Sequence, residues 1–403
     1  MSEQPFTLHV PDSALEFLQK KLELTRLPDE IDGAGWDYGV PLSDIKRLVA
    51  RWKNGYDWRA SEKAINELPQ FTRDIEVEGH GTLNIHYVHK KSEVENAIPL
   101  LFVHGWPGHF MEASKIIPIL TKGGSDQPSF HLVVFSLPGY GFSDAPKKPG
   151  FALHQYAEVG HKLMLALGYH EYVTQGGDWG HLITREMQRL YGNTYIKAWH
   201  TNIVFVGPPQ FTKAPLKYLQ HLVTPYRKRD KDGLARTQWF QTVSSGYLAE
   251  QSTKPQTLGY SLSDSPVGLL AWIYEKLVEW TDGYKWTDDE VLTWVSIYWF
   301  SKAGPTASTR IYYEALRSGD FNVYASWTNV PCGISYFPKD VVQAPKLWPR
   351  ALGNIVFEHE HDVGGHFAAY EEPGLLAADL RKMFGNGGPA FGVVSGKNGY
   401  NTL

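Results

Sequence analysis

Three glycine-rich segments of the sequence hold side chains that could take part in covalent chemistry. The first, residues 175–180 (Gln-Gly-Gly-Asp-Trp-Gly), follows an apolar run and precedes a helical pattern. A sharp strand-to-helix turn that presents a nucleophile needs small residues on both sides, and here the nucleophile position holds Asp178. A carboxylate can be alkylated at carbon to give an ester that water later cleaves, but it attacks esters and amides poorly. Because an isolated aspartate at a helix start more often caps the helix, the interpretation depends on its partners.

The second segment, residues 104–108 (His-Gly-Trp-Pro-Gly), follows directly on the apolar run 100–103. A glycine-rich turn at the carboxyl end of a strand can aim backbone N–H groups at a developing oxyanion. The N–H of Trp106, together with the N–H of Trp179 after the proposed nucleophile, would form such an oxyanion hole. The alternative is a tight turn with no chemical role.

The third segment, residues 362–367 (Asp-Val-Gly-Gly-His-Phe), follows the last predicted strand and precedes a helix that starts near residue 373. His366 lies on a glycine-flanked loop, where an imidazole is free to act as a general base. The chain order nucleophile, acid, histidine places the acid after the preceding strand, and Asp340 occupies that position. The alternatives, which lie within or next to the last strand, are Glu358, Glu360 and Asp362.

The elements around these segments predict an α/β fold with a mostly parallel central sheet. Short apolar runs at 100–103, 132–135, 172–174, 334–337 and 355–357 are typical of buried parallel strands joined by crossover helices. Residues 75–77 and 83–89 alternate with a period of two, which predicts a pair of strands before the parallel ones. The spacing of apolar residues predicts surface helices at 12–26 and 43–52.

The chain divides into four consecutive parts. Strand patterns fade between Phe205 and Phe321, where helical segments rich in tryptophan and tyrosine predominate. The clearest of these helices has Ser265 as its N-cap and Pro266 at its first position, and it runs to Trp280. We therefore predict a lead-in at 1–92, a first core segment at 93–204, a helical insertion at 205–322 and a second core segment at 323–403.

Composition excludes several classes of protein. The 403 residues are 20% charged and 14% aromatic, which is too apolar for a disordered chain. The net charge is −4 and no dense lysine or arginine run is present, so nucleic acid is not an expected partner. The single cysteine, Cys332, excludes an intrachain disulfide and a cysteine-based metal site. The N-terminal region has no apolar run of the length that a signal peptide or membrane span requires, so we expect a soluble cytoplasmic protein.

Taken together, the motifs resemble those of a known family. They are residues 104–108, 137–144 (Leu-Pro-Gly-Tyr-Gly-Phe-Ser-Asp), 176–180 and 364–373 (Gly-Gly-His-Phe-Ala-Ala-Tyr-Glu-Glu-Pro). The chain resembles the α/β-hydrolase-fold epoxide hydrolases, particularly the microsomal-type branch that includes soluble fungal members. The resemblance covers nearly the whole chain, with the lead-in matching that branch's N-terminal meander and the insertion matching its helical cap. The membrane-anchor helix of the branch is missing here, which implies a soluble enzyme.

The resemblance implies a role for each site residue. Asp178 would be the nucleophile, Asp340 the acid and His366 the base that activates water. Opening an epoxide also requires an acid opposite the attacking carboxylate, and phenols can supply hydrogen bonds and a proton. In the family two cap tyrosines do this, and they match Tyr247 and, in the segment 310–314, Tyr312, with the adjacent Tyr313 as the alternative.

The resulting hypothesis is an epoxide hydrolase that forms vicinal diols through an alkyl ester on Asp178. It needs no metal and no organic cofactor. Its partner would be a small-molecule epoxide bound in an apolar pocket that Trp106, Trp179, Tyr247 and Tyr312 line. Family members often dimerise through core or cap surfaces, so the resemblance allows a homodimer, but the sequence does not determine the oligomeric state.

Three other functions share parts of this pattern. A haloalkane dehalogenase also uses an aspartate nucleophile, but that family typically has asparagine where this chain has Trp106. A serine esterase would have serine at position 178. A hydrolase scaffold retained for binding would be expected to lack one member of the catalytic machinery, and all members are present in this sequence.

Overall fold

A computed structural model describes residues 3–123, 126–319 and 327–401. Within these residues one nine-stranded sheet has the order β1-β2-β3-β5-β4-β6-β7-β8-β9. The pairs between β1, β2, β3 and β5 are antiparallel, and all the remaining pairs are parallel. The predicted α/β class with a mostly parallel sheet is therefore confirmed. The strands are β1 (Gln4–Pro5), β2 (Gln70–Val77), β3 (Gly81–Lys90), β4 (Ile98–Val103), β5 (Phe130–Phe135), β6 (Tyr172–Gly176), β7 (Ile196–Thr201), β8 (Thr328–Tyr336) and β9 (Gly353–Glu360).

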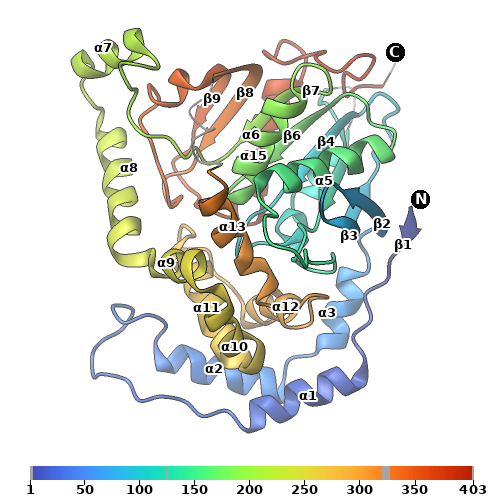
Figure 1. The fold of residues 1–403 in the computed structure, drawn as a ribbon, viewed down its shortest axis with the longest axis vertical. Helices are drawn as coiled ribbons and strands as arrows, with labels where there is room; N and C mark the ends of the chain where they lie inside the picture. The colour runs from blue at the N-terminus through green and yellow to red at the C-terminus, as the bar shows by residue number, and fades with distance from the viewer. Residues whose placement is uncertain (1–2, 124–125, 320–326, 402–403) are drawn as a thin grey trace.

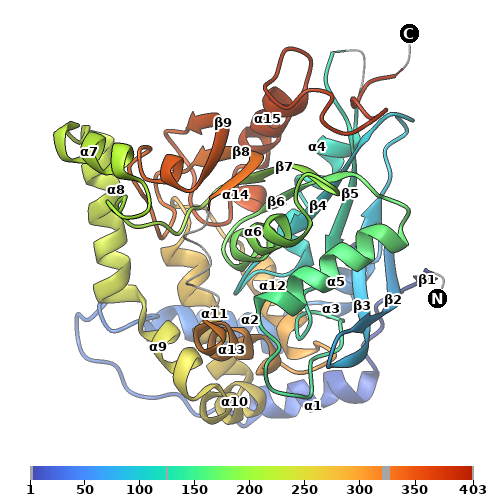
Figure 2. The ribbon, with the colours of Figure 1, turned by 45° about the horizontal axis from the view of Figure 1, so that its top comes forward.

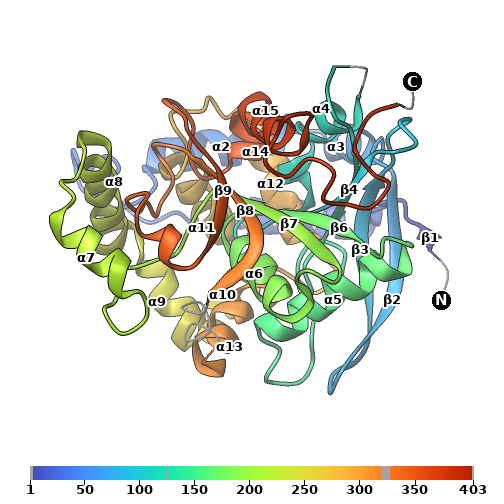
Figure 3. The same ribbon diagram turned by 90° about the horizontal axis from the view of Figure 1, so that it is seen from above.

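The predicted apolar runs form strands because both faces of the sheet are covered. Leu101 and Val103 of β4 pack in the cluster with α5 (Leu153–Ala166) and α6 (Trp179–Tyr191). Leu100 and Phe102 face the opposite cluster, which includes α4 (Ile117–Thr121), α14 (Ala368–Glu371) and α15 (Pro373–Phe384). Figure 3 shows these two groups of helices on the two sides of the sheet.

One strand of the parallel sheet was not predicted. Strand β7 has the sequence Ile-Lys-Ala-Trp-His-Thr, so Lys197 and His200 interrupt the apolar run that would have indicated it. His200 is nevertheless buried, and its ring bonds to the hydroxyl of Ser335 in β8.

Helices lie between β7 and β8, in the part of the chain where we predict the insertion. The Ser265 hydroxyl accepts a hydrogen bond from the N–H of Gly268 at 2.9 Å, as expected of an N-cap, and α11 begins at Pro266. The predicted boundary at 322/323 lies outside the described residues. Between β7 and β8, the helices of eight or more residues among the described residues are α7 (Pro215–Val223), α8 (Lys228–Trp239), α9 (Gly246–Thr253), α10 (Pro255–Asp264), α11 (Pro266–Glu279), α12 (Asp288–Trp299) and α13 (Arg310–Ser318).

The lead-in connects the insertion to the core. Its helices α1 (Asp12–Glu23) and α2 (Leu42–Asn54) lie beside α10, α11 and α12, and α3 (Trp58–Ile65) follows (Figures 1 and 2). Arg51 on α2 forms a bidentate ion pair with Asp289 on α12, at 2.8 and 2.9 Å. These contacts hold the insertion over the carboxyl edge of the sheet. Across the described residues, no helix combines the length and apolarity needed to cross a membrane.

Candidate active site

Asp178 occupies a sharp turn between β6 and α6. Its backbone has φ 51° and ψ −128°, a combination that is strained for a residue with a side chain. The turn needs Gly180 because a Cβ at that position would lie 1.9 Å from the carbonyl oxygen of Val103. Helix α6 therefore starts in contact with the end of β4, and the carboxylate is presented next to the turn that follows that strand.

The turn 104–108 binds the carboxylate of Asp178 directly. The N–H of Trp106 donates to Asp178 Oδ1 at 2.8 Å. A Cβ at Gly105 would lie 2.2 Å from the same oxygen, so the Asp178 carboxylate can come this close to the turn only if residue 105 is glycine. One of the two N–H groups that the sequence predicted for an oxyanion hole thus lies at Asp178, and Trp179, which carries the other, is the first residue of α6.

Two aromatic residues of the insertion donate hydrogen bonds to the turn 104–108. Trp294 Nε1 donates to the carbonyl oxygen of Pro107 at 2.7 Å, and the hydroxyl of Tyr298 donates to the carbonyl oxygen of Gly108 at 2.6 Å. Both residues lie on α12 and are buried. Neither residue could be singled out from the sequence, because the chain has 14 tryptophans and 22 tyrosines and neither residue lies in a motif.

His366 lies between the two predicted carboxylates. Its Nδ1 is 2.7 Å from Asp340 Oδ1, and its Nε2 is 3.5 Å from Asp178 Oδ2. The N–H of Val341 also donates to Asp340 Oδ1, at 2.7 Å, which fixes this carboxylate in the loop after β8. The N–H of His366 donates to the carbonyl oxygen of Trp280 at 2.8 Å, so the end of α11 positions the histidine loop.

The alternative acids are engaged elsewhere. Glu358 accepts a hydrogen bond from the hydroxyl of Tyr336 at 2.9 Å and also pairs with Arg350. Glu360 forms an ion pair with Arg227 at 2.8 Å. The side chain of Asp362 is fully exposed. Among the four candidates, the structure brings only Asp340 into hydrogen-bond contact with His366.

The two carboxylates determine the charge of His366. Burial alone would lower its pKa, but the neighbouring Asp340 and Asp178 carboxylates outweigh burial and raise the pKa of His366 to about 10. At neutral pH the free protein therefore holds an imidazolium between two carboxylates. Loss of the negative charge of one of the two carboxylates would lower this pKa and favour the neutral imidazole, which can act as a base.

Tyr247 and Tyr312 lie together beside the two tryptophans. The rings of Trp106 and Tyr247 stack with their centroids 5.1 Å apart, and Tyr312 packs edge-on against Trp179 at 4.7 Å. Burial, reinforced by the Asp178 carboxylate, raises the pKa of both tyrosines well above the ordinary value, so both keep their protons at neutral pH. The Tyr312 hydroxyl is buried and lies next to the side chains of Tyr247 and Trp179.

Tyr313 points away from this group. The guanidinium of Arg317, one turn further along α13, lies 3.6 Å from the centroid of the Tyr313 ring. Adjacent residues of a helix face different directions, so only one of the two tyrosines can face Tyr247. In this structure that residue is Tyr312.

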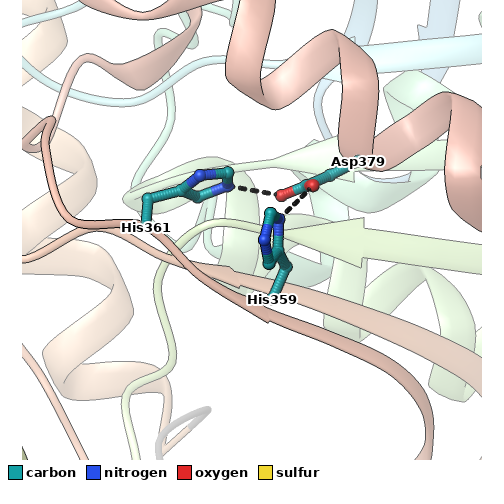
Figure 4. A group of neighbouring side chains, drawn as sticks. All are labelled: His359, His361 and Asp379. Atoms are coloured by element: carbon teal, nitrogen blue, oxygen red, sulfur yellow. Dashed lines mark hydrogen bonds and ion pairs between the residues drawn. The ribbon is translucent and has the colours of Figure 1, made fainter.

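A second polar cluster, centred on the buried Asp379, joins β8, β9 and α15 (Figure 4). The Asp379 carboxylate binds His359 Nδ1 at 2.5 Å, His361 Nε2 at 2.6 Å and the hydroxyl of Ser335 at 2.5 Å. Two imidazoles and a carboxylate have the composition of a metal site, but here the facing nitrogen atoms already bind the carboxylate. We therefore interpret the cluster as a structural network that satisfies a fully buried charge.

Asp379→Ala is expected to lower the free energy of unfolding by about 3–5 kcal/mol, because it removes the carboxylate that pairs with the buried His361 and accepts a hydrogen bond from Ser335. Urea unfolding followed by circular dichroism measures this loss. Asp264→Ala, which removes an exposed carboxylate from an ion pair with Lys21, is the control and should cost less than about 1 kcal/mol. A loss below about 1 kcal/mol for Asp379→Ala would show that the network contributes little to stability.

The sheet, the turn after β6 and the helical insertion define an α/β hydrolase. Residues 98–242 match the family model described as "alpha/beta hydrolase fold", and residues 3–113 match the one described as "Epoxide hydrolase N terminus". A putative epoxide hydrolase of Stigmatella aurantiaca is 38% identical over 94% of this chain and 84% of its own length. Epoxide hydrolase 1 of Sus scrofa is also 38% identical, over 95% of this chain and 89% of its own length.

Solved structures give the same result. The epoxide hydrolase of Aspergillus niger superposes with a TM-score of 0.81 at 34% identity, over 94% of this chain and 95% of that one. The juvenile hormone epoxide hydrolase of the silkworm Bombyx mori superposes with a TM-score of 0.85 at 30% identity, over 94% of this chain and 93% of that one. The chain belongs to the epoxide hydrolase family, and the predicted family, fold and enzyme class are confirmed.

Proposed function

We propose that this enzyme converts epoxides to vicinal diols through a covalent ester on Asp178, which water activated by His366 and Asp340 then hydrolyses. One observation carries the proposal: a carboxylate, an imidazole 3.5 Å from it and two protonated, buried phenols share one aromatic-lined site. The names of the relatives support an epoxide as the substrate class.

Ring opening is the first step. Asp178 Oδ1 is held by the N–H of Trp106, so Oδ2 is the oxygen that forms a bond to an epoxide carbon. The carbon–oxygen bond of the ring breaks as Tyr247 and Tyr312 donate hydrogen bonds to the departing oxygen, and one of them gives it a proton. Because the Tyr247 and Tyr312 side chains lie next to each other, an epoxide oxygen between them could accept hydrogen bonds from both hydroxyls.

Hydrolysis of the ester is the second step. Esterification removes the negative charge of Asp178, so the pKa of His366 falls and the imidazolium gives up its Nε2 proton, which neutralises the tyrosinate left by ring opening. The neutral Nε2 then takes a proton from water as the water oxygen attacks the carboxyl carbon, while the N–H groups of Trp106 and Trp179 stabilise the oxyanion. The bond from the carboxyl carbon to Oδ2 then breaks, the diol oxygen takes the proton from His366, and the proton of the regenerated carboxyl group returns to His366.

The surroundings favour apolar substrates. Trp106, Tyr247, Tyr312 and Trp280 form a cluster of rings whose centroids are 5.1 to 6.4 Å apart, and all four side chains are buried. Aromatic side chains of this kind bind aryl and alkyl groups through apolar contact. The steps above use only side chains and main-chain N–H groups of this chain.

A comparison of three substrates tests the reaction class. Styrene oxide should give phenylethanediol, whereas 1-chlorobutane and 4-nitrophenyl acetate should give chloride and nitrophenol no faster than the Asp178→Ala variant does. Chloride release that exceeds diol formation would favour a dehalogenase. Nitrophenol release that exceeds diol formation would favour an esterase.

Tyr247→Phe and Tyr312→Phe should each slow ring opening by about one to two orders of magnitude, because each removes a hydrogen bond worth about 1.5–3 kcal/mol to the forming alkoxide. Single-turnover kinetics followed by tryptophan fluorescence measures this step, and the double variant should be almost inactive. Tyr313→Phe is the matched control and should react at the wild-type rate. A silent Tyr312→Phe with an impaired Tyr313→Phe would show that the second proton donor is Tyr313.

A further inference from the structure

Glu112 is a buried acid next to the proposed catalytic centre, and the mechanism above does not use it. It lies in the short helix η1 (Phe110–Ala113), directly after the turn 104–108. Its side chain is buried, with 9% of the residue exposed. Within the described part of the chain, no hydrogen bond joins its carboxyl group to another residue, so the group can accept one from a bound molecule.

Two carboxyl groups pack closely against two glycines of the turn 104–108. A Cβ at Gly105 would lie 2.2 Å from Asp178 Oδ1, and a Cβ at Gly108 would lie 2.2 Å from Glu112 Oε2. The carbonyl oxygen of Gly105 is 3.0 Å from that second position, which shows how compact the turn is. The carboxyl groups of Glu112 and Asp178 therefore rest on the same short turn, and both glycines are explained by the space that these groups occupy.

The charges around Glu112 are those of the catalytic centre. Burial raises the pKa of Glu112 to about 8, and Asp178 and Asp340 raise it while His366 lowers it. Tyr298 faces it from α12, and burial followed by the charge of Glu112 raises the pKa of that tyrosine. Glu112 thus interacts electrostatically with the nucleophile, the base and the acid, and at neutral pH it adds no full negative charge that would oppose the nucleophile.

We propose that Glu112 positions the water that hydrolyses the Asp178 ester, by accepting a hydrogen bond from the hydrogen that His366 does not take. The inference rests on the two-step function proposed above. One O–H bond of the water breaks and its proton goes to His366 Nε2, while the oxygen bonds to the carboxyl carbon of Asp178. The other hydrogen stays on that oxygen, bonded to Glu112, so Glu112 is unchanged and acts as a positioning residue. Holding both hydrogens of the water fixes its lone pair toward the ester.

The two half-reactions separate this role from a structural one. In single turnovers with styrene oxide, Glu112→Leu should form the ester at about the wild-type rate but hydrolyse it about 10- to 100-fold more slowly, so the ester accumulates. Glu112→Gln keeps an acceptor oxygen of the same shape and should restore most of the hydrolysis rate. If Glu112→Leu does not fold, Glu112→Ala provides the same comparison with Glu112→Gln.

The matched control is Glu158→Gln. Glu158 is a buried glutamate on α5 that bonds to the N–H of Glu78 and to Lys162, and its replacement should change neither half-reaction. Equal losses in both half-reactions of Glu112→Leu, or an unchanged hydrolysis rate, would overturn the role of Glu112. Failure of the wild-type enzyme to form any ester would instead overturn the proposed two-step function, so the two failures are distinguishable.

Discussion

His366→Gln is expected to become trapped as a covalent ester. Asp178 can still attack the epoxide, because the base acts only in the second step, but no group remains to activate water. Turnover should fall by about four orders of magnitude or more. After incubation with styrene oxide, mass spectrometry should show a peptide containing Asp178 that is heavier by one substrate molecule.

A second histidine gives the control for this trap. The side chain of His154 is 45% exposed and lies near Glu186, outside the site, so His154→Gln should keep wild-type turnover and carry no adduct. Loss of turnover in His366→Gln without any adduct would contradict the assignment of His366 to ester hydrolysis alone.

Asp178→Ala should form neither adduct nor diol, with turnover lowered by about four to six orders of magnitude, because the step that breaks the epoxide ring has lost its nucleophile. Chromatography of the diol after a long incubation measures the residual activity. Diol formation above about 1% of the wild-type rate would contradict the nucleophile assignment.

The strained backbone of Asp178 supplies a related control. Because φ is 51°, Asp178→Gly should relieve strain worth about 1–3 kcal/mol and melt at a higher temperature than the Ala variant, while remaining equally inactive. Equal melting temperatures would show that the turn itself is not strained.

Much of the fold follows from local sequence. The parallel strands lie between two packed layers, so continuous apolar runs predicted them, and β7 was missed because Lys197 and His200 interrupt its run. The end of each strand also indicated where Asp178, Asp340 and His366 lie, since parallel strands present their following loops at one edge. Their distances could not be predicted, because they depend on the packing of α11 against the loop of His366.

The contributions of the insertion depend on contacts between distant residues. Trp294 bonds to a carbonyl oxygen 187 positions earlier in the chain, and Tyr298 bonds to one 190 positions earlier. Tyr312 and Tyr313 are neighbours in one helix with the same chemistry, and the structure distinguishes them by the partner each one faces. Glu112 lies outside the glycine motif, and only the position of its carboxyl group against Gly108 connects it with the site.

A single turnover in water labelled with oxygen-18 tests the central claim, that Asp178 and not water attacks the epoxide. With enzyme in excess over styrene oxide, the first diol should contain only unlabelled oxygen, one atom from the epoxide and one from the Asp178 carboxylate. The label should appear instead in the peptide that contains Asp178, because water attacks the carboxyl carbon. Label in the diol of the first turnover, with none in that peptide, would show direct attack by water and contradict the account.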